Sequence, residues 1–275
     1  MTKIAVVSDL HMDLNHVDVV DFLARSADWL VAQGVQYYVI AGDLFNDFAK
    51  TLDFSEKLQT IVGDSLRVAF IVGNHDMARG VTFEELSQPL SPLYLHNQLI
   101  DVAGTDLRIV GQNGWYDYSF GDLAKYSVNE IAQWKRAYWF DRQIEQPMSD
   151  QERMDIVLTE SKQQLVNAAH DGKRVMFVTH FVPQQDYLFK GSDDRNLWML
   201  NAMMGSQRLG ALLEMGPVDY TIFGHLHRQF APQTFGGRNE YYNQTVGLKT
   251  HRKDEWTQST FFATWQDRVR IFEIK

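Results

Sequence analysis

Five short apolar runs in this sequence each end in a polar cluster of aspartate, asparagine, histidine or glycine. The runs cover residues 4–7, 37–41, 68–72, 175–179 and 220–223, and the clusters after them are Asp9-Leu10-His11, Gly42-Asp43, Gly73-Asn74-His75-Asp76, His180 and Gly224-His225-Leu226-His227. Short apolar runs separated by helical segments predict βαβ units and a mainly parallel sheet. Ligands bind beyond the carboxyl ends of the strands in such a sheet, so we expect the five clusters to meet at one edge.

The rest of the chain supplies the other expected elements. Apolar residues at helical spacing predict helices at about 19–34, 54–61, 149–172 and 206–214. Shorter strands are expected at 99–102 and 107–110, and the tail predicts a pair of antiparallel strands at 260–265 and 269–274. Ser149 and Glu152 have the spacing of a capping box, which starts the third of these helices.

The residue types in the five clusters favour binding of metal ions. Aspartate oxygen and neutral imidazole nitrogen suit manganese, iron or zinc. An aspartate and a histidine two residues apart can bind one ion together, and the two carboxylate oxygens of Asp43 can bridge two ions. Because side chains alternate along an extended segment, His225 and His227 are expected to point the same way and to serve one ion each. Glycine precedes three of the clusters and allows the backbone to turn tightly there.

On these residues the sequence resembles the calcineurin-like metallophosphoesterase superfamily. The motifs occur in the family's order between residues 9 and 227, and each follows a predicted strand. The resemblance implies an α/β fold, a four-layer α/β/β/α sandwich of two mixed sheets flanked by helices, in a single domain of residues 1–275. It also implies a hydrolase that cleaves phosphodiester or phosphomonoester bonds of a small-molecule substrate, using a hydroxide that bridges two divalent ions of manganese, iron or zinc.

The resemblance also implies a role for each residue of the motifs. Asp43 would bridge the two ions, and His75 would act as general acid for the leaving group rather than as a ligand. Asp9, His11 and His227 would bind the first ion, and Asn74, His180 and His225 the second.

Three residues are candidates to orient the imidazole of His75, namely Asn46, Asp47 and Asp76. In the family a carboxylate often lies three residues after the bridging aspartate. In this sequence that position is Asn46, and the carboxylate of Asp47 comes one residue later.

Two segments outside the motifs have two interpretations each. The aromatic-rich segment within residues 113–150 is either a cap or lid over the site or a satellite hydrophobic cluster on the main domain. The basic run at residues 249–253 is expected to be a solvated loop, and its alternative role is to clamp a substrate phosphate.

Composition narrows the alternatives. The chain has no cysteine, which excludes disulfides, thiolate-bound metals and a cysteine nucleophile. The net charge of −9 does not favour nucleic acid as partner, although a nuclease of the same superfamily stays an alternative. A non-catalytic metal-binding scaffold and a mononuclear oxygenase are further alternatives. No apolar run approaches the roughly 20 residues that span a bilayer, so we expect no membrane partner and a cytoplasmic location. The sequence does not fix the oligomeric state.

Overall fold

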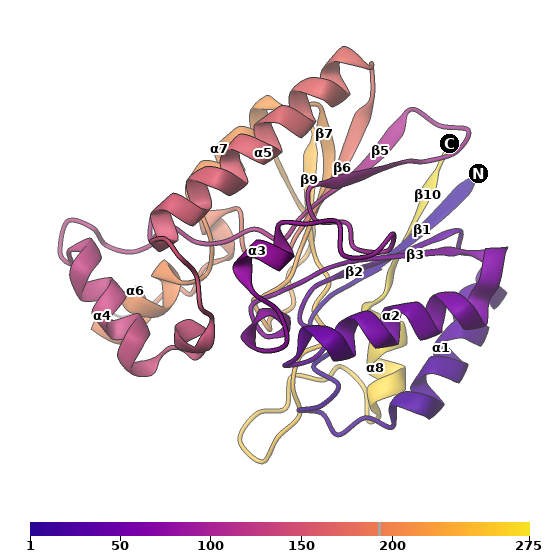
Figure 1. Ribbon diagram of the computed structural model, residues 1–275, viewed down its shortest axis with the longest axis horizontal. Coiled ribbons are helices and arrows are strands. Elements are labelled where there is room, and N and C mark those ends of the chain that lie inside the picture. The colour runs from indigo at the N-terminus through magenta and orange to yellow at the C-terminus, as the bar shows by residue number, and fades with distance from the viewer. Residues whose placement is uncertain (192–193) are drawn as a thin grey trace.

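Two β-sheets pack face to face, and helices cover their outer faces (Figure 1). This computed structural model describes residues 1–191 and 194–275. The first sheet has the strand order β10-β1-β2-β3, in which β1, β2 and β3 are parallel and β10 is antiparallel to β1. Its strands are β1 (Thr2–Val7), β2 (Tyr37–Ala41), β3 (Arg67–Ile71) and β10 (Arg270–Ile274).

The second sheet has six strands in the order β4-β5-β6-β7-β9-β8. Its four central strands are parallel, and the strand at each edge is antiparallel to its neighbour. The predicted fold of two mixed sheets flanked by helices is therefore confirmed. The strands are β4 (Gln98–Asp101), β5 (Leu107–Gln112), β6 (Arg174–Thr179), β7 (Val218–Phe223), β8 (Gln233–Phe235) and β9 (Asn239–Asn243).

Strand β1 shows how both faces of a sheet are buried. Ile4 and Val6 belong to the apolar layer between the two sheets, whereas Ala5 and Val7 belong to the layer beneath the helices. All four side chains are fully buried. Successive side chains of a strand point to opposite faces, so a strand that is covered on both sides must be apolar throughout. This explains why the run reads as continuous rather than alternating.

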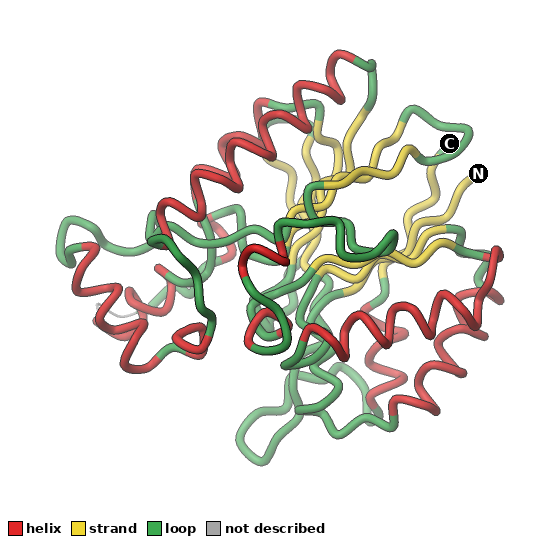
Figure 2. The backbone as a smooth tube through the Cα atoms, in the orientation of Figure 1, coloured by secondary structure: helices red, strands yellow, loops and turns green. Residues whose placement is uncertain are grey.

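Helices α1, α2 and α8 lie on the first sheet, and α5 and α7 lie on the second (Figure 1, Figure 2). The predicted capping box of Ser149 and Glu152 is present at the start of α5. Helices α4 and α6 pack against each other and project away from the sheets. The helices are α1 (Val19–Ala32), α2 (Phe48–Val62), α3 (Phe83–Leu86), α4 (Val128–Tyr138), α5 (Asp150–His170), α6 (Arg195–Ala202), α7 (Gln207–Met215) and α8 (Phe261–Arg268), with short 3₁₀ turns η1 (Gly63–Ser65), η2 (Asp76–Ala78), η3 (Phe140–Gln143) and η4 (Gln185–Tyr187).

The prediction of a strand at residues 260–265 was wrong, because this segment begins helix α8. The hydroxyl of Thr260 accepts a hydrogen bond from the backbone of Ala263 and caps the helix. Phe261 and Trp265 are four residues apart and lie on the buried face, where the Trp265 ring packs edge-on against Phe22. The strand that follows pairs with β1 instead of folding back on residues 260–265.

The five polar clusters do converge, but at the junction of two sheets rather than at one edge of one sheet. Three of them follow β1, β2 and β3 in the first sheet, and two follow β6 and β7 in the second. Hydrogen bonds join the two edges: the amide of Ser8 donates to the carbonyl of Gln244 over 2.9 Å, and the amide of Val72 donates to Asn113 Oδ1 over 3.1 Å. Among the described residues, no helix has the length and apolar character that crossing a membrane requires.

Candidate metal centre

Asp9, His11 and His227 form the first cluster of potential ligands. Asp9 Oδ1 lies 3.2 Å from His227 Nε2 and 3.8 Å from His11 Nε2, and the two Nε2 atoms are 3.0 Å apart. Asp9 and His11 are fully buried. Three ligand atoms at these separations can surround one cation.

Asp43, His180 and His225 form the second cluster. His180 Nδ1 is bonded to the carbonyl of Ala41 over 2.9 Å, which directs its Nε2 toward Asp43 Oδ2 at 3.2 Å. His225 Nε2 is bonded to the carbonyl of Met203 over 3.2 Å, which leaves the lone pair on its Nδ1. Each ring therefore has one nitrogen held by the backbone and one free to bind a cation.

Asp43 lies between the two clusters. Its Oδ2 is 3.7 Å from His11 Nε2, in addition to its approach to His180, and its Oδ1 accepts the backbone N–H of His75 over 2.8 Å. The motif after β2 therefore contacts the motifs after β1, β3 and β6. The geometry suits a carboxylate that is shared by two cations.

Four potential ligands have a left-handed backbone, which is uncommon outside glycine. The φ angles are +56° at Asp9, +43° at His11, +55° at Asp43 and +66° at His225. The expectation that residues 225–227 form an extended segment was therefore wrong. His225 and His227 diverge through this turn, so that His225 joins the second cluster and His227 the first.

The glycines of the motifs are required mainly because they leave space. Only Gly42 has a positive φ, of +89°. A Cβ on Gly73 would lie 2.1 Å from Asp43 Oδ1, and a Cβ on Gly224 would lie 2.3 Å from Asp9 Oδ2. The carboxylates thus occupy the volume that other side chains would fill, and the predicted role in turning holds only at Gly42.

His75 is oriented by Asn46 alone among the three predicted candidates. His75 Nδ1 is 2.6 Å from Asn46 Oδ1, and the ring stacks on Phe140 with centroids 3.9 Å apart. Asp47 instead caps helix α2. Asp76 is fully buried and accepts the backbone N–H groups of Asp43, Leu44, Phe45 and Gly73 together with the hydroxyl of Thr51, so it shapes the loop rather than the imidazole.

The charged groups of the site shift one another's pKa values. Burial alone would raise the pKa of Asp43, but the positive charges of His180 and His75 hold it well below its usual value. Burial alone would lower the pKa of His180, but the Asp43 carboxylate raises it to about 9. Burial and the charge of His180 lower the pKa of His225 to about 3. The site therefore combines ionised carboxylates with a strong demand for positive charge, which cations would satisfy by displacing protons.

The sequence profile of the calcineurin-like phosphoesterases matches residues 2–229. The chain belongs to this family. It is a hydrolase that acts on phosphoric esters. A comparison with curated protein sequences found no match.

Solved structures support the fold. The phosphopantetheinyl hydrolase from Mycobacterium tuberculosis has a TM-score of 0.65 at 16% sequence identity, over 98% of this chain and 95% of that chain. A dimetal phosphatase from Danio rerio has a TM-score of 0.52 at 14% identity, over 88% of this chain and 86% of that chain. At these identities the likeness concerns the fold alone.

Buried polar atoms show that this phosphoesterase can accommodate cations. Asn74 Oδ1 and His180 Nε2 are buried and have no hydrogen-bonding partner in the described part of the chain. An unsatisfied buried acceptor costs free energy of about 1–3 kcal/mol, and a bound cation removes that cost. Asn74 follows Gly73, against which Asp43 and His180 pack. The residues present therefore fit the metal ions that the family is expected to bind.

Two acidic residues that hydrogen-bond to potential ligands were not predicted from the sequence. Glu255 Oε2 is 2.8 Å from His227 Nδ1, and Asp141 Oδ1 accepts the Nδ2–H of Asn74 over 2.7 Å. Glu255 lies just after the basic run, whose residues are exposed as a solvated loop requires. Within that loop Lys249 pairs with Asp254 at 3.3 Å. No motif marks Asp141, which is fully buried in the long aromatic segment.

We expect Gly73→Ala to weaken manganese binding at least about tenfold, because the added Cβ would displace the carboxylate of Asp43 and the imidazole of His180. Manganese per chain, measured by mass spectrometry after equilibrium dialysis, tests this. Gly191→Ala is the matched control, since its Cβ would make only an ordinary contact of 3.7 Å with Leu197. Equal manganese content in both variants would contradict the packing argument.

We expect Asp141→Ala to lower affinity for one of two manganese ions by about tenfold, because Asn74 Nδ2 loses its acceptor and the amide is free to rotate. Asp141→Asn retains a carbonyl acceptor and should bind manganese more nearly like the natural protein. Titration calorimetry distinguishes the two variants. Loss of both ions in Asp141→Ala, or no difference between the variants, would show that Asp141 does not orient Asn74.

Proposed function

We propose that this phosphoesterase uses a binuclear metal centre. The observation that carries the proposal is the position of Asp43 between two clusters of ligand atoms, at 3.7 Å from His11 and 3.2 Å from His180. The proposed ligands are Asp9, His11 and His227 for one ion, Asn74, His180 and His225 for the other, and Asp43 for both.

Two bound divalent cations would supply a water of lowered pKa and would neutralise the charge of the phosphate. The protein's own residues do the rest. Asn46 Oδ1 accepts from His75 Nδ1–H and so leaves Nε2 to face the substrate. We propose that His75 donates a proton or hydrogen bond from this nitrogen to the leaving-group oxygen. Phe140 fixes the plane of the ring by stacking on it.

We propose that the segment of residues 113–150 is both a core cluster and a cap. Its first aromatic residues, among them Trp115 and Tyr116, are fully buried in the main core. Its later residues reach the site, since Phe140 stacks on His75 and Asp141 holds Asn74. The ring centroid of Trp139 lies 6.4 Å from that of His225. The two interpretations of the aromatic segment therefore apply to different parts of it.

The alternatives fit the site less well. A mononuclear oxygenase needs only one set of ligands, whereas Asp43 lies between two sets. A non-catalytic scaffold would not need the aligned pair of His75 and Asn46. A small-molecule phosphate ester is the proposed substrate, and a cytoplasmic location and manganese as the metal remain predictions. Esters of phosphopantetheine belong in a substrate screen because the similar Mycobacterium tuberculosis protein is named as their hydrolase.

We expect Asp43→Ala to reduce hydrolysis of bis-p-nitrophenyl phosphate and p-nitrophenyl phosphate, with added manganese, by at least about a hundredfold. The variant removes the carboxylate that lies between the two clusters. Asp64→Ala, at an exposed aspartate in η1, is the matched control and should keep the natural rate. A natural rate in Asp43→Ala would contradict the binuclear proposal. Circular dichroism checks that the variant is folded.

We expect His75→Ala to keep its manganese but to lose turnover by about a hundred- to ten-thousandfold, the usual contribution of a general acid. The effect should be larger for poor leaving groups, which need the proton more. His251→Ala, at an exposed histidine of the solvated loop, serves as the control. If His75→Ala loses manganese, His75 has been wrongly assigned as a non-ligand.

A further inference from the structure

A cavity of about 190 Å³ lies beside His75. Asn46 and Phe140 line it, and these are the two residues that hold the His75 ring by a hydrogen bond and by stacking. His75 is the proposed proton donor to the leaving group. The cavity therefore lies next to the two residues that position the proposed proton donor.

Two cationic side chains, those of Lys50 and Arg79, line the same cavity. Neither side chain has an ion pair or a hydrogen bond with any other described residue. Other exposed cations of this acidic chain are paired: Arg25 with Asp21 and Lys57 with Asp53 are examples. Lys50 and Arg79 thus retain charge that is available to a ligand.

The carboxylates of the cavity are already engaged. Asp13 accepts the backbone N–H groups of Leu14 and Asn46 over 2.9 and 3.0 Å. Asp47 accepts the backbone N–H of Ala49 over 2.9 Å as the cap of helix α2. Their positions are fixed by these bonds, and part of their charge is offset by the amides. The cationic hydrogen-bond donors of the cavity are therefore free to bind a ligand.

The backbone holds the two cations near each other. The amide of Phe48, in the first turn of α2, donates to the carbonyl of Arg79 over 3.0 Å, and Lys50 lies two residues further along this helix. Gly80 also packs against Asp47, because a Cβ there would lie 3.0 Å from Asp47 Oδ1. The loop after β3 is thus attached to the start of α2. The fold therefore brings Lys50 and Arg79 to the same cavity.

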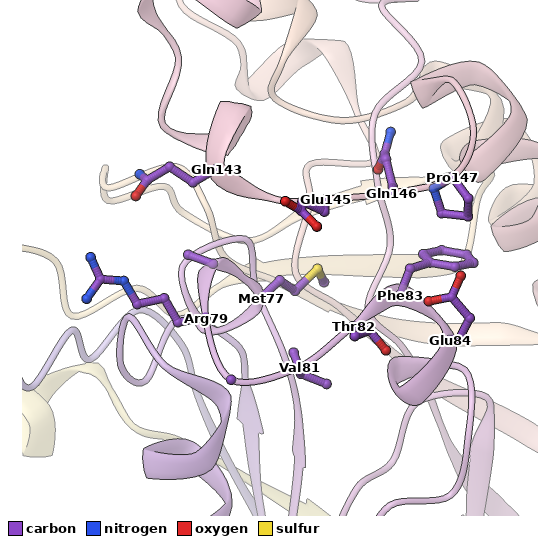
Figure 3. A pocket seen from close by; sticks show the side chains of 12 residues that line it. Met77, Arg79, Val81, Thr82, Phe83, Glu84, Gln143, Glu145, Gln146 and Pro147 are labelled. Atoms are coloured by element: carbon purple, nitrogen blue, oxygen red, sulfur yellow. The ribbon is translucent and has the colours of Figure 1, made fainter.

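A larger cavity of about 530 Å³ adjoins the first and shares Ala78, Arg79 and Gln143 with it. It lies between the loop of residues 77–84 and the segment of residues 143–147 (Figure 3). Arg79 and Gln143 are at one end of it, and Phe83 and Pro147 are at the other. An extended leaving group has room to continue past Arg79 into this space.

We propose that the cavity beside His75 is a leaving-group subsite, in which Lys50 and Arg79 bind an anionic group of the substrate. The substrate class is then a phosphate ester whose alcohol portion carries a second negative charge, such as a carboxylate or another phosphate. This inference rests on the proposed function, because it takes His75 as the residue that faces the leaving group. A guanidinium and an ammonium that line one cavity suit a carboxylate or phosphate well.

The test uses two substrates that differ in one charge. They are phenyl phosphates with a para propionate arm or the matching propionamide arm, so that the two phenols have nearly the same acidity. The natural protein with manganese is expected to have a kcat/KM for the propionate at least about fivefold above that for the amide. The preference should shrink in 1 M salt, because exposed charges are screened.

Variants of Lys50 and Arg79 show whether these residues cause the preference for the propionate. Arg79→Gln and Lys50→Gln should each reduce the ratio of the two kcat/KM values, and the double variant should bring it close to one. Arg67→Gln, at an exposed arginine that begins β3 and lines neither cavity, is the matched control and should keep the natural ratio. All three positions are exposed, so these variants are expected to fold normally.

Each outcome bears on a different claim. Hydrolysis of both substrates with a ratio near one in the natural protein would overturn the subsite and leave the phosphoesterase proposal intact. Hydrolysis of neither, together with none of p-nitrophenyl phosphate, would overturn the proposed function and the subsite with it. An equal fall of the ratio in Arg67→Gln would assign the preference to overall charge and would also overturn the subsite.

Discussion

The site depends on the buried carboxylate of Asp43. Its two oxygens contact the imidazoles of His11 and His180 and the backbone amide of His75, which belong to three other strand ends. Burial of a carboxylate is unfavourable unless positive charge or hydrogen-bond donors surround it. The surrounding loops supply both, and Gly73 provides the space for the side chain. Two sheets and four loops are therefore arranged around one charge.

Much of this arrangement was predictable from the sequence. Continuous apolar runs identified the buried strands, and the polar clusters after them identified the residues that meet. The junction of two sheets was not evident from the spacing of the motifs. A buried parallel strand has the same apolar sequence pattern whichever sheet it joins. Helix α8 was mistaken for a strand because the aromatic residues around Trp265 have high strand propensity, whereas its packing on Phe22 decides the helix.

Contacts between segments that are far apart in the chain could not be predicted from the sequence. Asp141 is 67 residues from Asn74, and nothing around it resembles a motif. Phe140 contacts His75 and Asp141 contacts Asn74, so consecutive residues of the proposed cap contact consecutive residues of the motif after β3. The proposed cap and the candidate metal centre are thus in contact through η3. Substrate groups that contact this proposed cap would therefore affect the imidazole of His75 and the side-chain amide of Asn74.

The left-handed backbone at Asp9, His11, Asp43 and His225 has a thermodynamic consequence. Each such residue stores about 1–3 kcal/mol of strain, and the sum is comparable to the whole stability of an ordinary domain. Ions that bind only the folded chain would offset this strain by mass action. The fraction of the protein that is folded in a cell would then follow the supply of divalent cations, so that scarcity of metal would reduce its abundance as well as its turnover.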